Sequence, residues 1–145
     1  MLIKVFLDSD VVISSLISQK GAAYFLIQEK INLKLIISNI SQEELSRVAI
    51  KLSIGQDKTS KLIKEKLKVI QIRKKSEHLK KIFGDYVTDL NDAHIIAGAE
   101  KAKVRFLISY NIKHFQIDKI KQDFNIIVTT PANFLQYLRS LKKYC

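Results

Sequence analysis

Short apolar runs alternate with segments of helical periodicity along the whole chain. The apolar runs predict buried strands at residues 3–7, 34–37, 69–72, 104–109 and 125–129. Helical spacing of apolar residues predicts helices at 11–18, 22–30, 41–52, 58–68, 76–83, within 87–99 and at 131–141. Strands that alternate with helices predict an α/β fold, here a three-layer α/β/α sandwich with a mostly parallel central sheet.

The segment 87–99 predicts a helix that packs closely against the sheet. Its interior is apolar and rich in alanine, and Gly98 has no side chain to keep a neighbouring element away. Asp89 and Asp92 stand at its beginning, three residues apart, a spacing that can place both carboxylates on one helical face. We therefore expect both acids to face a packed boundary rather than open water.

Length and composition predict one globular domain over residues 1–145. The chain is 47% hydrophobic and 27% charged, and no low-complexity linker divides it. Its only cysteine, Cys145, excludes a disulfide within the chain. The first apolar run is too short, and is interrupted too soon by Asp8, for a signal peptide or a membrane span. We expect a cytoplasmic protein that does not contact the membrane.

Positive charge is concentrated in the middle of the chain. The net charge is +11, and residues 51–81 hold eleven basic and three acidic side chains, a local balance of +8. Such a field favours a polyanionic partner, with nucleic acid as the first candidate and an acidic protein or an anionic membrane as the others. A lysine-rich surface that is only solvated is the alternative interpretation.

Polar side chains follow the predicted strands where parallel strands would end together. The candidates are Asp8 and Asp10 after the first strand, Ser38 and then Glu44 after the second, Asp89 and Asp92 at the start of the small-residue helix, and Ser109 and Asn111 after the fourth strand. In sheets of this kind, sites gather at the carboxyl ends of the strands. Clustered carboxylates repel one another unless cations neutralise them, and oxygen ligands suit Mg²⁺ or Mn²⁺. In a basic protein this predicts metal-assisted phosphodiester chemistry, with a metal that activates and orients water and stabilises charge on the phosphate.

Each candidate also has a purely structural interpretation. Asp8 or Asp10 could cap the first helix, and Glu44 could complete a capping box with Ser41. Asp89 and Asp92 could serve only the helix dipole. Asn111 is typical of turns. The histidines have no paired metal-ligand spacing and are interpreted as structural or surface residues: His78, His94 and His114.

Four segments of the chain resemble the PIN domain, the nuclease fold of many bacterial and archaeal toxin-antitoxin toxins. They are residues 6–14, 37–45, 89–97 and 107–115, in the right order and spacing, and residues 130–135 also resemble the end of that family. The resemblance implies that Asp8, Glu44 and Asp92 bind Mg²⁺ or Mn²⁺ as the catalytic residues. It adds Asp89 and Asn111 as further metal ligands.

The resemblance also implies the function. It implies a metal-dependent endoribonuclease that hydrolyses RNA phosphodiester bonds, the toxin of a toxin-antitoxin pair, with RNA, an antitoxin protein and a second copy of the chain as partners. Two positions depart from the family pattern. Asp10 stands where the family usually has Asn, and Asn111 stands where it often has Asp, so one negative charge is lost at Asn111 and can be restored by Asp10.

Two alternative functions stay open at this stage. Residues 8–12 and Ser38 are also similar to the first two motifs of haloacid dehalogenase phosphatases, and residues 84–89 to their metal motif. In that chemistry Asp8 attacks phosphorus and Asp10 is the general acid and base. Asp10→Asn should therefore abolish the activity of a phosphatase but reduce the activity of a nuclease only slightly. The other alternative is a module that binds RNA or an antitoxin without turnover.

Overall fold

One parallel sheet forms the centre of the molecule. The structure is a computed structural model that describes residues 2–29 and 32–143. Its strands are β1 (Ile3–Leu7), β2 (Leu33–Ser38), β3 (Lys68–Ile70), β4 (Phe106–Ile108) and β5 (Ile127–Thr129). They are ordered β3-β2-β1-β4-β5, and every neighbouring pair is parallel. The predicted α/β class with a parallel sheet is confirmed.

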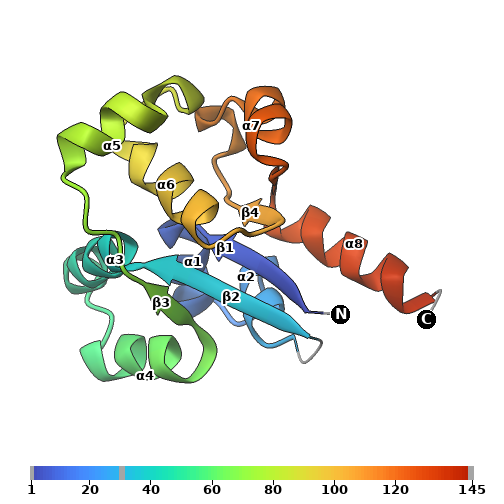
Figure 1. Cartoon of the computed structure of the whole chain (residues 1–145). Helices are drawn as coiled ribbons and strands as arrows, with labels where there is room; N and C mark the ends of the chain where they lie inside the picture. Colours follow the sequence, from blue (N-terminus) through green and yellow to red (C-terminus); the bar gives the residue numbers. More distant parts are fainter. Residues whose placement is uncertain (1, 30–31, 144–145) are drawn as a thin grey trace.

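Helices cover both faces of this sheet (Figure 1). One face packs against α1 (Ser9–Ile17), α2 (Ala22–Ile27), α3 (Asn39–Lys51), α4 (Gln56–Lys66) and α8 (Pro131–Lys143). The other packs against α5 (Ser76–Phe83), α6 (Ala93–Lys101) and α7 (Ile117–Phe124). Each face of the sheet has its own hydrophobic core, and successive side chains of β1 point to opposite faces. Val5 and Leu7 therefore pack in the core beneath the first set of helices, and Phe6 packs in the core beneath the second set. The predicted three-layer sandwich is therefore confirmed.

The small residues of α6 bring that helix close to β1. A Cβ atom on Gly98 would lie 2.6 Å from Cζ and 2.7 Å from Cε2 of Phe6, whose ring is fully buried. The close approach that the sequence predicts for this helix is thus present, and Gly98 permits it.

Gly98→Ala is expected to destabilise the protein by about 1–3 kcal/mol, because the added methyl group overpacks the ring of Phe6. Chemical denaturation measures the change. Gly55→Ala is the control, since nothing lies within 4 Å of a Cβ there; Gly55 is the N-cap of α4, so this substitution should cost no more than about 1 kcal/mol. Equal effects at the two positions would contradict the close packing.

One helix was not predicted. The sequence predicts only a loop between the strand 104–109 and the last strand, but residues 117–124 form α7. Its apolar positions Ile117, Ile120 and Phe124 follow helical spacing, and Ile120 is fully buried. The periodic signal was therefore present in the sequence and was overlooked.

Several element ends also differ from the prediction. The third strand ends at Ile70 rather than at Ile72, because the side chain of Asn39 takes up both backbone polar groups of Ile72. The Ile72 N–H donates to Asn39 Oδ1 at 2.8 Å, and Asn39 Nδ2 donates to the Ile72 carbonyl at 3.2 Å. The helix predicted over 22–30 ends at Ile27, and position 30 lies outside the described residues. Within residues 2–29 and 32–143, no helix is long and apolar enough to span a bilayer.

Candidate active site

The ends of β1 and β4 meet at the expected edge of the sheet. Leu7 is paired with Ile108, and the backbone N–H of Asp8 donates to the Ile108 carbonyl at 2.9 Å. The next residue, Ser109, donates its hydroxyl proton to Asp8 Oδ2 at 2.8 Å. Residues about a hundred positions apart in the sequence are thereby joined, as parallel pairing of these strands predicts.

Asp8 is a largely buried carboxylate in a field of like charges. It occupies the N-cap position of α1, but its side chain makes no capping hydrogen bond. Burial, the largest cause, and the charge of Asp10 raise the pKa of Asp8 to about 7, against the hydrogen bond from Ser109, which lowers it. The charges of Glu44 and Asp92 add to the same rise in pKa. Four acids from three parts of the chain therefore act on one another at this edge.

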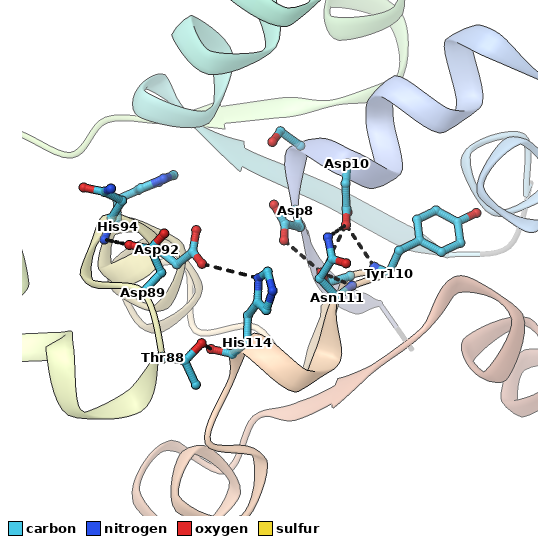
Figure 2. Close-up of polar contacts among 12 residues, drawn as sticks. Asp8, Asp10, Thr88, Asp89, Asp92, His94, Tyr110, Asn111 and His114 are labelled. Carbon is cyan, nitrogen blue, oxygen red and sulfur yellow. Dashed lines mark hydrogen bonds and ion pairs between the residues drawn. The ribbon is translucent and has the colours of Figure 1, made fainter.

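Asp10 is held by the segment that follows β4 (Figure 2). Its Oδ2 accepts hydrogen bonds from Asn111 Nδ2 at 3.0 Å, Tyr110 N at 3.2 Å and Ser109 Oγ at 3.4 Å. Its Oδ1 is buried without a hydrogen-bond partner. Burial raises the pKa of Asp10 while these donors lower it.

Glu44 lies on α3 and is held by two other elements. Its Oε1 accepts a hydrogen bond from the Ser9 hydroxyl, and its Oε2 lies 3.4 Å from Nε2 of His94 on α6. The hydrogen bond with His94 lowers the pKa of Glu44, so the carboxylate is favoured. The capping-box interpretation of Glu44 is wrong, because Ser38 is the N-cap of α3 and accepts from Ser41 N at 3.1 Å.

Asp92 and Asp89, which the sequence treats alike, have different surroundings. Asp92 is partly buried at the start of α6, and its Oδ2 lies 3.8 Å from His114 Nδ1. Burial and the charge of Asp89 raise the pKa of Asp92. Asp89 is exposed, and its Oδ1 accepts from Asn91 N at 3.0 Å, which caps the 3₁₀ turn Leu90–Asp92. The expectation that both acids face a packed boundary is wrong for Asp89.

Two histidines contact acids of the site, which sequence reasoning missed. His94 contacts Glu44, and His114 contacts Asp92. Both stand close in sequence to candidate residues, the first two positions after Asp92 and the second three positions after Asn111. That proximity was the available signal, but whether a ring turns toward an acid depends on the packing of distant elements. His78, by contrast, is exposed on α5.

The family model for the PIN domain matches residues 4–113, which is most of the chain. This chain belongs to the PIN domain family. None of the curated proteins matches it closely enough to count as a relative.

Solved structures share the fold of this PIN domain at low sequence identity. A toxin-antitoxin complex from Klebsiella pneumoniae aligns with a TM-score of 0.64 and 22% identity, over 88% of this chain and 97% of that one. VapBC-1 from nontypeable Haemophilus influenzae aligns with a TM-score of 0.61 and 17% identity, over 90% and 99%. VapBC2 from Rickettsia felis, bound to a promoter DNA fragment, aligns with a TM-score of 0.59 and 18% identity, over 88% and 98%.

The donor set of this PIN domain fits a divalent cation in its chemistry. Carboxylate oxygens are the ligands that Mg²⁺ and Mn²⁺ prefer, and Asp10 offers a buried oxygen that no hydrogen bond satisfies. Burial first, and the neighbouring acids after it, raise the pKa of Asp8, so the surrounding protein disfavours its charged form. Within the described part of the chain, however, no three His, Cys, Asp or Glu side chains are already arranged as a metal site. The acids therefore have to move toward one another to bind one ion together.

The metal motif of the phosphatase interpretation lies elsewhere in this PIN domain. Gly84–Tyr86 form a 3₁₀ turn directly after α5 rather than following a strand. Asp85 is exposed and lies 3.9 Å from Lys119 Nζ. The turn that carries Asp85 therefore does not follow a strand of the sheet, although the phosphatase motif requires it to.

Proposed function

We propose that this PIN domain is a Mg²⁺- or Mn²⁺-dependent endoribonuclease that hydrolyses RNA phosphodiester bonds. The observation that supports it is the convergence of Asp8, Glu44 and Asp92 at one edge of the sheet, where the latter two raise the pKa of the buried Asp8. A basic chain with uncompensated acids at one edge suits a polyanionic substrate and a divalent cation together.

In this proposal Asp8, Glu44 and Asp92 hold the metal. When bound, the ion supplies a Lewis acid that stabilises charge on the phosphate and lowers the pKa of water. The serine hydroxyls fix two of the acids, Ser109 by donating to Asp8 and Ser9 by donating to Glu44. The Ser109 bond uses only Oδ2 of Asp8, so Oδ1 of Asp8 is the oxygen assigned to the cation in this proposal. Glu44 Oε2, by contrast, already contacts His94 and would have to share that oxygen with the ion.

The loop between β3 and α5 offers RNA a basic approach to the site. Arg73, Lys74 and Lys75 are exposed and follow the carboxyl end of β3, the edge at which Asp8 also lies. Other lysines of the basic region lie on α4, which packs on one face of the sheet. Within the basic region 51–81, the loop with Arg73, Lys74 and Lys75 is therefore the part that follows a strand at the edge of the sheet where Asp8 lies.

Replacing Arg73, Lys74 and Lys75 together with alanine is expected to weaken RNA binding about tenfold and to lower the salt slope of log K by up to about 2, because phosphate contacts are lost. Fluorescence anisotropy against salt concentration measures both quantities. Replacing Lys61, Lys64 and Lys66 of α4 removes the same charge at exposed positions. An equal loss from the α4 variant would show that only net charge matters.

We also propose an antitoxin protein as a partner. This rests on the structurally similar proteins from Klebsiella and Haemophilus, whose structures are a toxin-antitoxin complex and a VapBC complex. The net charge of +11 favours an acidic partner. Coexpression with a small acidic protein encoded beside this chain should yield a complex whose RNA cleavage is suppressed. A complex of undiminished activity would contradict this role.

The nuclease proposal is tested by offering the protein three substrates in Mn²⁺. A mixed structured RNA should be cleaved, the DNA of the same sequence should be cleaved more slowly or not at all, and a phosphomonoester should be untouched. Release of phosphate from the monoester would favour the phosphatase. Salt-dependent RNA binding without products would favour a binding module.

A further inference from the structure

We propose that Asp10 is a metal ligand of this site through its Oδ1 and that Asn111 is the residue that positions it. The inference rests on the proposed function, since it names a further ligand of the same site. Asp10 was not among the metal ligands that the sequence resemblance implies.

The two oxygens of Asp10 are used unequally. Oδ2 accepts from a hydroxyl, a backbone N–H and a side-chain amide, all contributed by residues 109–111. Oδ1 is buried and accepts nothing. A buried carboxylate oxygen without a partner is unfavourable, and the two N–H donors on Oδ2, from Tyr110 and Asn111, keep the group from turning to satisfy Oδ1. A cation at Oδ1 would supply the missing partner.

The same contacts join Asp10 to the central acid of the site. The Ser109 hydroxyl donates to Asp8 Oδ2 at 2.8 Å, approaches Asp10 Oδ2 at 3.4 Å, and accepts from the backbone N–H of Asn111 at 3.0 Å. One residue therefore sets the placement of both carboxylates relative to each other. Ser109 thus contacts both carboxylates, and in this proposal one cation is assigned to the two of them.

The hydrogen bond between Asn111 and Asp10 allows a test in which the residue types at positions 10 and 111 are exchanged. Its Nδ2 donates to Asp10 Oδ2 at 3.0 Å, and an amide and a carboxylate can form such a bond with the two residue types in either order. Exchanging them keeps the hydrogen bond and the charge while moving the carboxylate to the other side of the pair. Recovery of metal binding in the exchanged protein would therefore report on the pair rather than on either residue alone.

Mn²⁺ binding by the full chain, measured by isothermal titration calorimetry without RNA, tests the proposal. Asp10→Asn should weaken Mn²⁺ affinity about tenfold or more, because a charged ligand is lost, and Asn111→Ala should weaken it about threefold through loss of positioning. The double variant Asp10→Asn with Asn111→Asp should return to within about threefold of the original affinity. Asp85→Asn removes the same charge at an exposed position far from the strand ends and should bind Mn²⁺ like the unchanged protein.

The outcomes separate this proposal from the nuclease proposal. Unchanged Mn²⁺ affinity in Asp10→Asn, with circular dichroism confirming the fold, overturns the role of Asp10 and leaves the nuclease proposal intact. Unchanged Mn²⁺ affinity in Asn111→Ala overturns the positioning role of Asn111. Mn²⁺ binding that depends on Asp10 in a protein that cleaves no RNA supports this proposal and overturns the nuclease. Cleavage by Asp10→Asn should recover at high Mn²⁺ concentration, whereas a phosphatase that has lost its general acid would not recover.

Discussion

Asp8→Asn is expected to abolish RNA cleavage and, in the metal-free protein, to raise stability at neutral and higher pH. The pKa of Asp8 is raised from 3.8 to about 7 by burial and by neighbouring acids. Between these values the folded protein keeps a proton that the unfolded chain has released, so this contribution to stability is lost as the pH rises from about 4 to about 7. Asparagine does not ionise, and the variant avoids a penalty on the order of 4 kcal/mol.

Chemical denaturation in EDTA at pH 5 and at pH 8 measures this effect. The unchanged protein should lose more stability than Asp8→Asn between the two pH values, and the two should be most alike at pH 5. Asp57→Asn is the control, because that carboxylate is exposed in the first turn of α4 and should leave the pH dependence unchanged. If the free energy of unfolding depends on pH identically in the unchanged protein and in Asp8→Asn, ionisation of Asp8 does not destabilise the fold, and this prediction is wrong. Excess Mn²⁺ should stabilise the unchanged protein more than the variant.

Asp92→Asn is expected to reduce RNA cleavage by about a thousandfold or more while leaving the fold intact, because a charged ligand of the proposed metal is lost. Its carboxylate is 26% exposed, and its one ion-pair contact is with His114 at 3.8 Å, so asparagine fits the same space. Initial rates on a labelled RNA at saturating Mn²⁺ measure the loss, and thermal melting checks the fold.

Asp89→Asn is the matched control for that variant. The two acids are three residues apart, but the Asp89 carboxylate is exposed and caps a 3₁₀ turn. Asparagine caps about as well as aspartate, so this substitution should keep the cap and reduce activity by less than about tenfold. If the two variants lose activity equally, Asp89 belongs to the metal site after all. If Asp92→Asn keeps its activity, the assignment of Asp92 is wrong.

Much of the fold can be predicted from the sequence, because the clearest hydrophobic patterns lie within single strands and helices. The apolar runs of β1 and β2 and the small residues around Gly98 each predict their element without knowledge of the rest. Parallel pairing then follows from the alternation of strands and helices, and it places Asp8 beside Ser109, as observed. These parts of the site follow from which strands end in polar residues.

What the sequence missed depends on packing between distant elements. Glu44 and His94 are fifty residues apart and meet only because α3 and α6 both approach the same edge of the sheet. Periodicity reports which side of a helix is apolar, but not which polar groups meet above the sheet. The different surroundings of Asp89 and Asp92 arise in the same way, because the chain forms a 3₁₀ turn before α6 rather than one continuous helix.

Cleavage of a structured RNA with Mn²⁺, compared with the same reaction in EDTA and with the Asp92→Asn variant, tests the central claim most directly. The claim is that acids at one edge of the sheet bind a metal ion that cleaves RNA. It predicts products only when both the metal and Asp92 are present. Products that persist in EDTA or with Asp92→Asn would contradict it, as would the absence of products from folded protein that binds Mn²⁺.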